Sequence, residues 1–194
     1  MAPFHEVRLT VACLGWGSLV WKPEDLPLRG EWTNDGPFLP IEFARESNRR
    51  RITLVVVDGP EMVQSLWAPM AASTLEAAKG ELAKREGITD ENIVYSIGWW
   101  DRASGQHHGR SSAIVAAWAA ERNLDAVVWT NLKPGFRASR GTLPTYEQVL
   151  AHLRGLENEE KDLAEEYVRK APAQVATPYR EGLVRDLGWS LLAA

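Results

Sequence analysis

The chain has 194 residues, of which 45% are hydrophobic and 25% are charged. This composition is typical of a folded globular protein and excludes a largely disordered chain. The formal net charge of −4 argues against a nucleic-acid backbone or an anionic membrane surface as the main partner. The length predicts a single domain, residues 1–194, with a substantial core.

The only cysteine, Cys13, lies in an apolar run, so an intrachain disulfide is impossible and a reducing compartment is expected. The N-terminal sequence lacks the apolar core of a secretory signal. No apolar stretch reaches the roughly 20 residues needed to cross a bilayer. We therefore expect a cytoplasmic protein, and nothing in the sequence indicates its oligomeric state.

The first two thirds of the chain is rich in strand patterns. Apolar runs and apolar–polar alternation between glycine- and proline-containing turns are typical of strands. They predict strands at Val7–Leu14, Leu39–Ser47, Ile52–Val57, Val63–Ala68, Ile93–Trp100 and Ala126–Thr130.

Two helical patterns lie between the predicted strands, and helical patterns dominate the C-terminal third. Ser73–Glu86 opens with a capping box of Ser73 and Glu76 and is followed by Gly87, a residue suited to the left-handed C-cap. The other predicted helices are Ser111–Asn123, with Ser111 or Ser112 as cap, Tyr146–Gly155, Asn158–Lys170 and Pro178–Leu187, with Thr177 as cap. Strands followed by helices indicate an α+β fold rather than a parallel doubly wound sheet.

Two glycines make a sharp turn directly after the first predicted strand, in Gly15–Leu19 (GWGSL). Glycine lets the backbone approach a ligand closely, and successive free N–H groups form a concavity that binds anions. The alternative is a tight loop in which the glycines serve geometry alone. The turn lacks the third glycine of a dinucleotide fingerprint and the G-x-S-x-G frame of a hydrolase.

Glu86 falls on the apolar stripe of its predicted helix, close in angle to Leu75 and Leu82. Burial and the negative end of the helix dipole both disfavour a carboxylate there, conditions under which an acid serves as a general base near neutral pH. The alternative is that Glu86 is solvated or pairs with a neighbouring arginine.

Six segments of the chain follow one another in an order that a known family shares. They are Gly17–Pro23 (GSLVWKP), Leu28–Trp32 with Phe43–Ser47 (LRGEW and FARES), Leu82–Glu86 (LAKRE), Ala126–Asn131 (AVVWTN) and Pro178–Leu183 (PYREGL). Together they resemble the ChaC-type gamma-glutamylcyclotransferases. The resemblance implies a small mixed barrel-like sheet with surrounding helices and a helical C-terminal third.

The resemblance also implies an activity, the release of 5-oxoproline from a gamma-glutamyl amine or peptide such as glutathione. In that reaction the substrate's own amine attacks its γ-carbonyl, with Glu86 as general base and no cofactor or metal. Trp16, Gly17, Ser18 and Leu19 would contact the substrate. Trp16 stands where the family has a tyrosine, and this difference keeps open a non-catalytic member of the fold that binds a small metabolite or a protein.

Two further residues are candidates for substrate binding. Arg45 lies on the predicted strand Leu39–Ser47, where it would clamp a carboxylate or form a surface ion pair. Tyr95 offers a pocket hydroxyl or a core ring. The basic run Arg49–Arg51 is interpreted as a solvated turn, and the adjacent His107 and His108 point apart, so no zinc site is expected.

Overall fold

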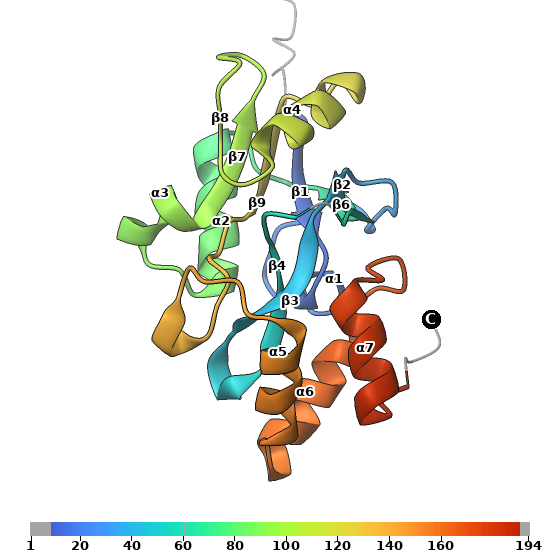
Figure 1. Ribbon diagram of the computed structural model, residues 1–194. Coiled ribbons are helices and arrows are strands. Elements are labelled where there is room, and N and C mark those ends of the chain that lie inside the picture. Colours follow the sequence, from blue (N-terminus) through green and yellow to red (C-terminus); the bar gives the residue numbers. More distant parts are fainter. Residues whose placement is uncertain (1–8, 60, 191–194) are drawn as a thin grey trace, which may run out of the picture.

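The protein, as a computed structural model, is described over residues 9–59 and 61–190 and is a mixed α+β structure (Figure 1). Its largest sheet has the strand order β6-β1-β9-β7-β8. These strands are β1 (Val11–Gly15), β6 (Leu66–Pro69), β7 (Ile97–Asp101), β8 (His107–His108) and β9 (Ala126–Thr130). Only β1 and β9 pair in parallel within it, as expected for α+β rather than doubly wound architecture. The first two residues of the predicted strand Val7–Leu14 lie outside the described residues.

Successive side chains of β1 and β9 point to opposite faces of this sheet, and both faces are buried. One face joins β3, β4 and the C-terminal helices in the larger cluster, and the other packs against α2 (Leu75–Glu86). The side chains on the first face are those of Ala12, Leu14, Val127 and Trp129, and those on the second are Val11, Cys13, Ala126 and Val128.

Two small sheets complete the β-structure, and the described strands form no closed barrel. The small sheets pair β2 (Phe38–Leu39) with β5 (Val63–Gln64) and β3 (Ile41–Glu46) with β4 (Ile52–Val56). The described strands therefore show the α+β class that was expected, in three separate sheets, and not the barrel-like sheet that the resemblance implies. The predicted strand Leu39–Ser47 is divided at Pro40, which has no N–H for a ladder. The predicted strand Val63–Ala68 is divided at Ser65, because Val63–Gln64 pairs with β2 and the following Leu66–Pro69 pairs with β1.

The helix α2 ends as predicted, but its N-cap lies one residue later than predicted and the helix itself begins at Leu75. The N-cap is Thr74, whose hydroxyl accepts from Ala77 N at 3.1 Å, and Gly87 closes the helix with φ of 66°. The predicted capping box at Ser73 is wrong, because Thr74 takes the cap position. The carboxylate of Glu86 is thus held on the last residue of a helix that packs against β9 and β7.

The predicted strand Ile93–Trp100 is wrong in its first half. Residues Ile93–Ser96 form the short helix α3, which follows the 3-10 turn η2 (Asp90–Asn92). Val94 and Tyr95 are exposed there, and without a neighbouring strand their β-propensity does not decide the backbone conformation. The helix α4 (Ser112–Glu121) follows β8, with Ser111 as an N-cap whose side chain makes no capping bond.

The C-terminal helices are present as predicted. They are α5 (Tyr146–Arg154), α6 (Asn158–Lys170) and α7 (Pro178–Leu187), which gather beside β3 and β4 at one end of the molecule (Figure 1). Thr177 caps α7 by accepting from Arg180 N. Among the described residues, no helix has both the length and the apolar character needed to cross a membrane.

The side chain of Arg180 ties α7 to the end of α6. It is 2% exposed, and its guanidinium donates to the carbonyl oxygens of Pro172, Val175, Val168 and Ala171. These carbonyls lie at and beyond the C-terminus of α6, where backbone acceptors lack helical partners. A positively charged donor is also favoured at that end of the helix dipole.

Arg180→Met should lower the free energy of unfolding by about 3 kcal/mol, because several buried carbonyl groups lose their donor. Urea denaturation followed by circular dichroism measures the change. The control, Arg185→Met, removes a guanidinium that is 70% exposed and should shift stability by less than about 0.5 kcal/mol. Equal effects of the two changes would contradict the bridging role of Arg180.

Candidate functional site

A pocket of about 450 Å³ opens where the end of β1 meets β3, β4, α2 and α6. This volume is in the usual range for sites that bind small molecules. Its walls include the glycine turn and the short helix α1 (Ser18–Trp21), the end of α2, and the segment around the 3-10 turn η3 (Arg137–Ser139). The pocket therefore brings together segments from nearly the whole length of the chain.

The turn needs glycine at positions 15 and 17 because neighbouring side chains leave no room there for a Cβ. A Cβ on Gly15 would lie 2.5 Å from the Trp32 ring, and one on Gly17 would lie 2.4 Å from the Tyr167 hydroxyl. The φ of Gly17 is −128°, so the requirement comes from space and not from a left-handed backbone. The turn is thus pressed against two aromatic side chains while it lines the pocket.

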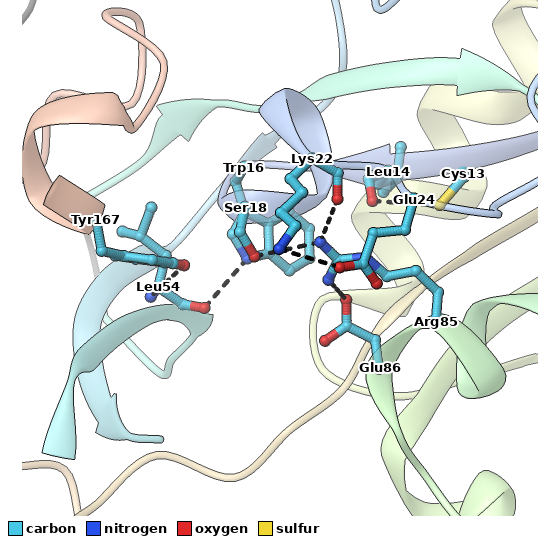
Figure 2. Close-up of polar contacts among 10 residues, drawn as sticks. All are labelled: Cys13, Leu14, Trp16, Ser18, Lys22, Glu24, Leu54, Arg85, Glu86 and Tyr167. Carbon is cyan, nitrogen blue, oxygen red and sulfur yellow. Dashed lines mark hydrogen bonds and ion pairs between the residues drawn. The ribbon is translucent and has the colours of Figure 1, made fainter. Parts of the chain in front are cut away.

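Glu86 lines the same pocket as the glycine turn. Its side chain is 18% exposed, and Glu86 Oε1 lies 2.6 Å from Arg85 Nη1. Arg85 also donates to Lys22 O at 2.6 Å, so the guanidinium joins the end of α2 to the chain after the glycine turn (Figure 2). The carboxylate is therefore both pocket-lining and paired with its neighbouring arginine, which combines the two interpretations that the sequence left open.

Trp16 forms part of the pocket wall without filling the pocket. Its side chain is 4% exposed within the main core, and its indole N–H donates to Leu54 O at 3.3 Å. The bond joins the glycine turn to β4 (Figure 2).

Tyr167 is a pocket residue that the sequence did not single out. It comes from α6, packs against the turn, and accepts from Leu54 N at 3.3 Å through its hydroxyl oxygen (Figure 2). Burial raises the pKa of Tyr167 to about 12, although backbone amides at Leu54 and Ser18 lower it. The phenol stays protonated at neutral pH, and its own proton remains for an acceptor in the pocket.

Arg45 lines the pocket, whereas Tyr95 does not. The Arg45 guanidinium donates to Lys133 O at 2.8 Å and makes no ion pair among the described residues, so the alternative of a surface ion pair is wrong. Tyr95 is 68% exposed on α3 and lies outside the pocket lining. This placement corrects its assignment as a pocket hydroxyl, because the segment turns outward as a helix.

The arginine run has two different environments. Arg49 and Arg50 pair with Glu159 and Glu160 of α6 at the surface. Arg51 instead lines the pocket, with its guanidinium 5.8 Å from the centre of the Tyr167 ring. The interpretation of the whole run as a solvated turn is therefore wrong for its last residue.

Two more arginines, Arg137 and Arg140, reach the pocket from the segment after β9. Nothing in their local sequence marks them, since they lie in a loop without periodic pattern. Within the described residues, no cluster of three or more His, Cys, Asp or Glu side chains is placed to hold a metal ion. In comparisons with protein-family models, curated proteins and solved structures, no match to this chain was found.

Gly17→Ala should destabilise the protein by about 2 kcal/mol, because the new methyl group collides with the Tyr167 hydroxyl. Tyr167→Phe removes that oxygen and leaves the ring carbon Cζ at 3.4 Å, an ordinary contact. The double variant should therefore lose at least about 1 kcal/mol less than the two single changes added together. Thermal and urea unfolding of the four proteins measure this coupling.

Gly80→Ala is the control, since nothing lies within 4 Å of a Cβ at that helical position. It should leave stability unchanged or raise it by up to about 1 kcal/mol. Strict additivity of the Gly17 and Tyr167 changes would mean that the two groups do not touch in solution.

Proposed function

We propose that the protein is a gamma-glutamylcyclotransferase-like enzyme of ChaC type, which releases 5-oxoproline from a gamma-glutamyl amine or peptide. One observation carries the proposal: Glu86 and the Gly15–Leu19 turn line one pocket of ligand size. The segments that resemble the family also include these two features of the sequence. The same resemblance makes a gamma-glutamylcyclotransferase-like fold the finer assignment for this α+β structure.

In this reaction, the α-amine of the substrate attacks its own γ-carbonyl carbon. A C–N bond forms to close the five-membered ring, and the C–N bond to the leaving amine breaks. Glu86 accepts the proton from the attacking nitrogen and supplies one to the departing nitrogen. Because the attack is intramolecular, the pocket has to hold only one molecule in a folded, reactive conformation.

The oxygen of the attacked carbonyl gains negative charge in the transition state. Donors fixed before the reaction stabilise such an oxyanion without reorganising. The amides of the glycine turn and the hydroxyl of Tyr167 are candidates for this role, and the contact at Gly17 keeps them together. The guanidinium group of Arg85, at the end of α2, supplies positive charge for the substrate's α-carboxylate.

The ion pair between Arg85 and Glu86 favours a second candidate function. A carboxylate already engaged at 2.6 Å is a less available base, and the same pocket would then bind a small acidic metabolite without chemistry. The two functions differ in one measurable quantity, which is turnover.

The test incubates the purified chain with gamma-glutamyl amino acids, gamma-glutamyl amines and glutathione, and quantifies 5-oxoproline by mass spectrometry. We expect product from at least one compound and a fall of roughly 10²–10⁴-fold in kcat for Glu86→Gln, because the base is lost. Glu121→Gln is the matched control: this glutamate also ends a helix, α4, but is exposed outside the pocket. It should retain full activity.

Two outcomes would separate the alternatives. Binding of gamma-glutamyl compounds without any 5-oxoproline would favour the non-catalytic function. Product formation that Glu86→Gln leaves intact would remove the proposed base and with it this mechanism.

A further inference from the structure

The charges around the pocket are unequal. Its lining contains five arginines and two glutamates, namely Arg45, Arg51, Arg85, Arg137, Arg140, Glu46 and Glu86. Arg85 is paired with Glu86, and the Glu46 carboxylate accepts from the backbone N of Arg137 at 2.9 Å. The remaining four arginines form no ion pair among the residues that the structure describes. We call Arg45, Arg51, Arg137 and Arg140 the arginine cluster.

The backbone fixes three members of the arginine cluster in place. Arg45 donates to Lys133 O at 2.8 Å, Arg140 to Glu46 O at 2.8 Å, and Arg137 to Ser47 O at 3.1 Å. A guanidinium has five N–H donors, so each keeps several that these bonds do not use. The side chains are therefore oriented before a ligand arrives, which lowers the entropic cost of binding it.

Two buried donors, one within the cluster and one next to it, lack hydrogen-bond partners among the described residues. Arg51 makes no side-chain hydrogen bond among the described residues, and its Nε is buried. The hydroxyl of Ser47, also on the pocket lining, is buried without a partner. A buried donor that bonds to nothing costs free energy, and a ligand with acceptor oxygens would remove this cost at both positions.

The cluster is also unfavourable electrostatically by itself. Burial, and then the charge of Arg140, lower the pKa of Arg45 to about 10. Burial likewise lowers the pKa of Arg140; the charge of Glu46 opposes this lowering, and the charge of Arg137 adds to it. Like charges that are partly removed from water repel one another, and a bound anion would offset the repulsion.

We propose that the arginine cluster, with Ser47, is a second anion site that binds a carboxylate or phosphate group on the leaving amine of the substrate. It lies on the β3, β4 and η3 side of the pocket, whereas Glu86 comes from α2 and the glycine turn from β1 and α1. The assignment to the leaving amine rests on the proposed cyclotransferase function. The cluster thereby selects gamma-glutamyl compounds whose departing half is acidic over those whose departing half is neutral.

The first arm of the test needs no turnover. Isothermal titration calorimetry at low ionic strength, with inorganic phosphate and with glutarate as probes, compares the unaltered chain with Arg51→Gln. Arg51 is chosen because its side chain makes no protein hydrogen bond that the change would break. Arg29→Gln, at an exposed position outside the pocket, is the control with the same loss of charge.

We expect at least one probe to bind, with a dissociation constant that rises tenfold or more in Arg51→Gln and stays unchanged in Arg29→Gln. The stronger of the two probes identifies the oxyanion as phosphate or carboxylate. No binding of either probe, or equal weakening in both variants, would overturn the anion site. Circular dichroism confirms that each variant is folded as the unaltered chain is.

The second arm compares gamma-glutamylalanine with gamma-glutamylalaninamide, whose departing halves end in a charged carboxylate and in a neutral carboxamide of nearly the same size. We expect kcat/KM to be at least tenfold higher for the acid, and the ratio to fall towards one in Arg51→Gln. A ratio near one in the unaltered chain would remove the assignment to the leaving amine. If neither compound yields 5-oxoproline, the proposed cyclotransferase activity fails for these two compounds. The calorimetric arm still shows whether the arginine cluster binds an anion.

Discussion

The contact between Gly17 and the Tyr167 hydroxyl is the constraint on which the pocket depends. It brings the first strand's turn against a helix of the C-terminal third, with no space for a side chain between them. The same hydroxyl accepts from Leu54 N, a residue 113 positions away, and Trp16 bonds to Leu54 O. The turn, β4 and α6 are thus joined at one point, and any shift among them would change the shape of the pocket floor.

Arg180 extends this constraint into the C-terminal helices. By binding carbonyl groups at the end of α6, it fixes the helix that carries Tyr167 relative to α7. Glu42 reinforces the arrangement from β3, since its buried carboxylate accepts from Tyr179 N and from the hydroxyl of Thr177, the cap of α7. The C-terminal helices therefore help to shape the pocket, although only Tyr167 among their residues lines it.

The parts of the fold that were predictable are those set by neighbouring residues. Gly87 at the end of α2 and Thr177 at the start of α7 were recognisable, because a capping residue bonds to backbone groups only a few residues away in the sequence. The Ile93–Ser96 segment was predicted wrongly: it forms the helix α3, and none of the described strands pairs with it, although β-propensity depends on such pairing. Pro40 is a local signal that was available: a proline without an N–H divides a strand.

The candidate site divides in the same way. The glycine turn and Glu86 stand in short local motifs, so the sequence indicated both. Arg51, Arg137 and Tyr167 reach the pocket only through tertiary packing, and their local surroundings look like a basic turn, a loop and an ordinary amphipathic helix. Tyr95 was placed wrongly for the converse reason, since the strand that would have carried it inward is a helix at the surface.

The pocket's charge also limits what kind of anion reaches it. The chain as a whole has a formal charge of −4, and a net negative charge works against the attraction of a long polyanion. The pocket carries more arginines than acids within about 450 Å³, where low-dielectric walls strengthen attraction at short range. All the charges of a small molecule with two or three acidic groups can lie near the pocket arginines. Most charges of a polymer would instead lie outside the pocket, against the surface of a negatively charged protein. Size and charge together therefore favour a compact, multiply acidic ligand.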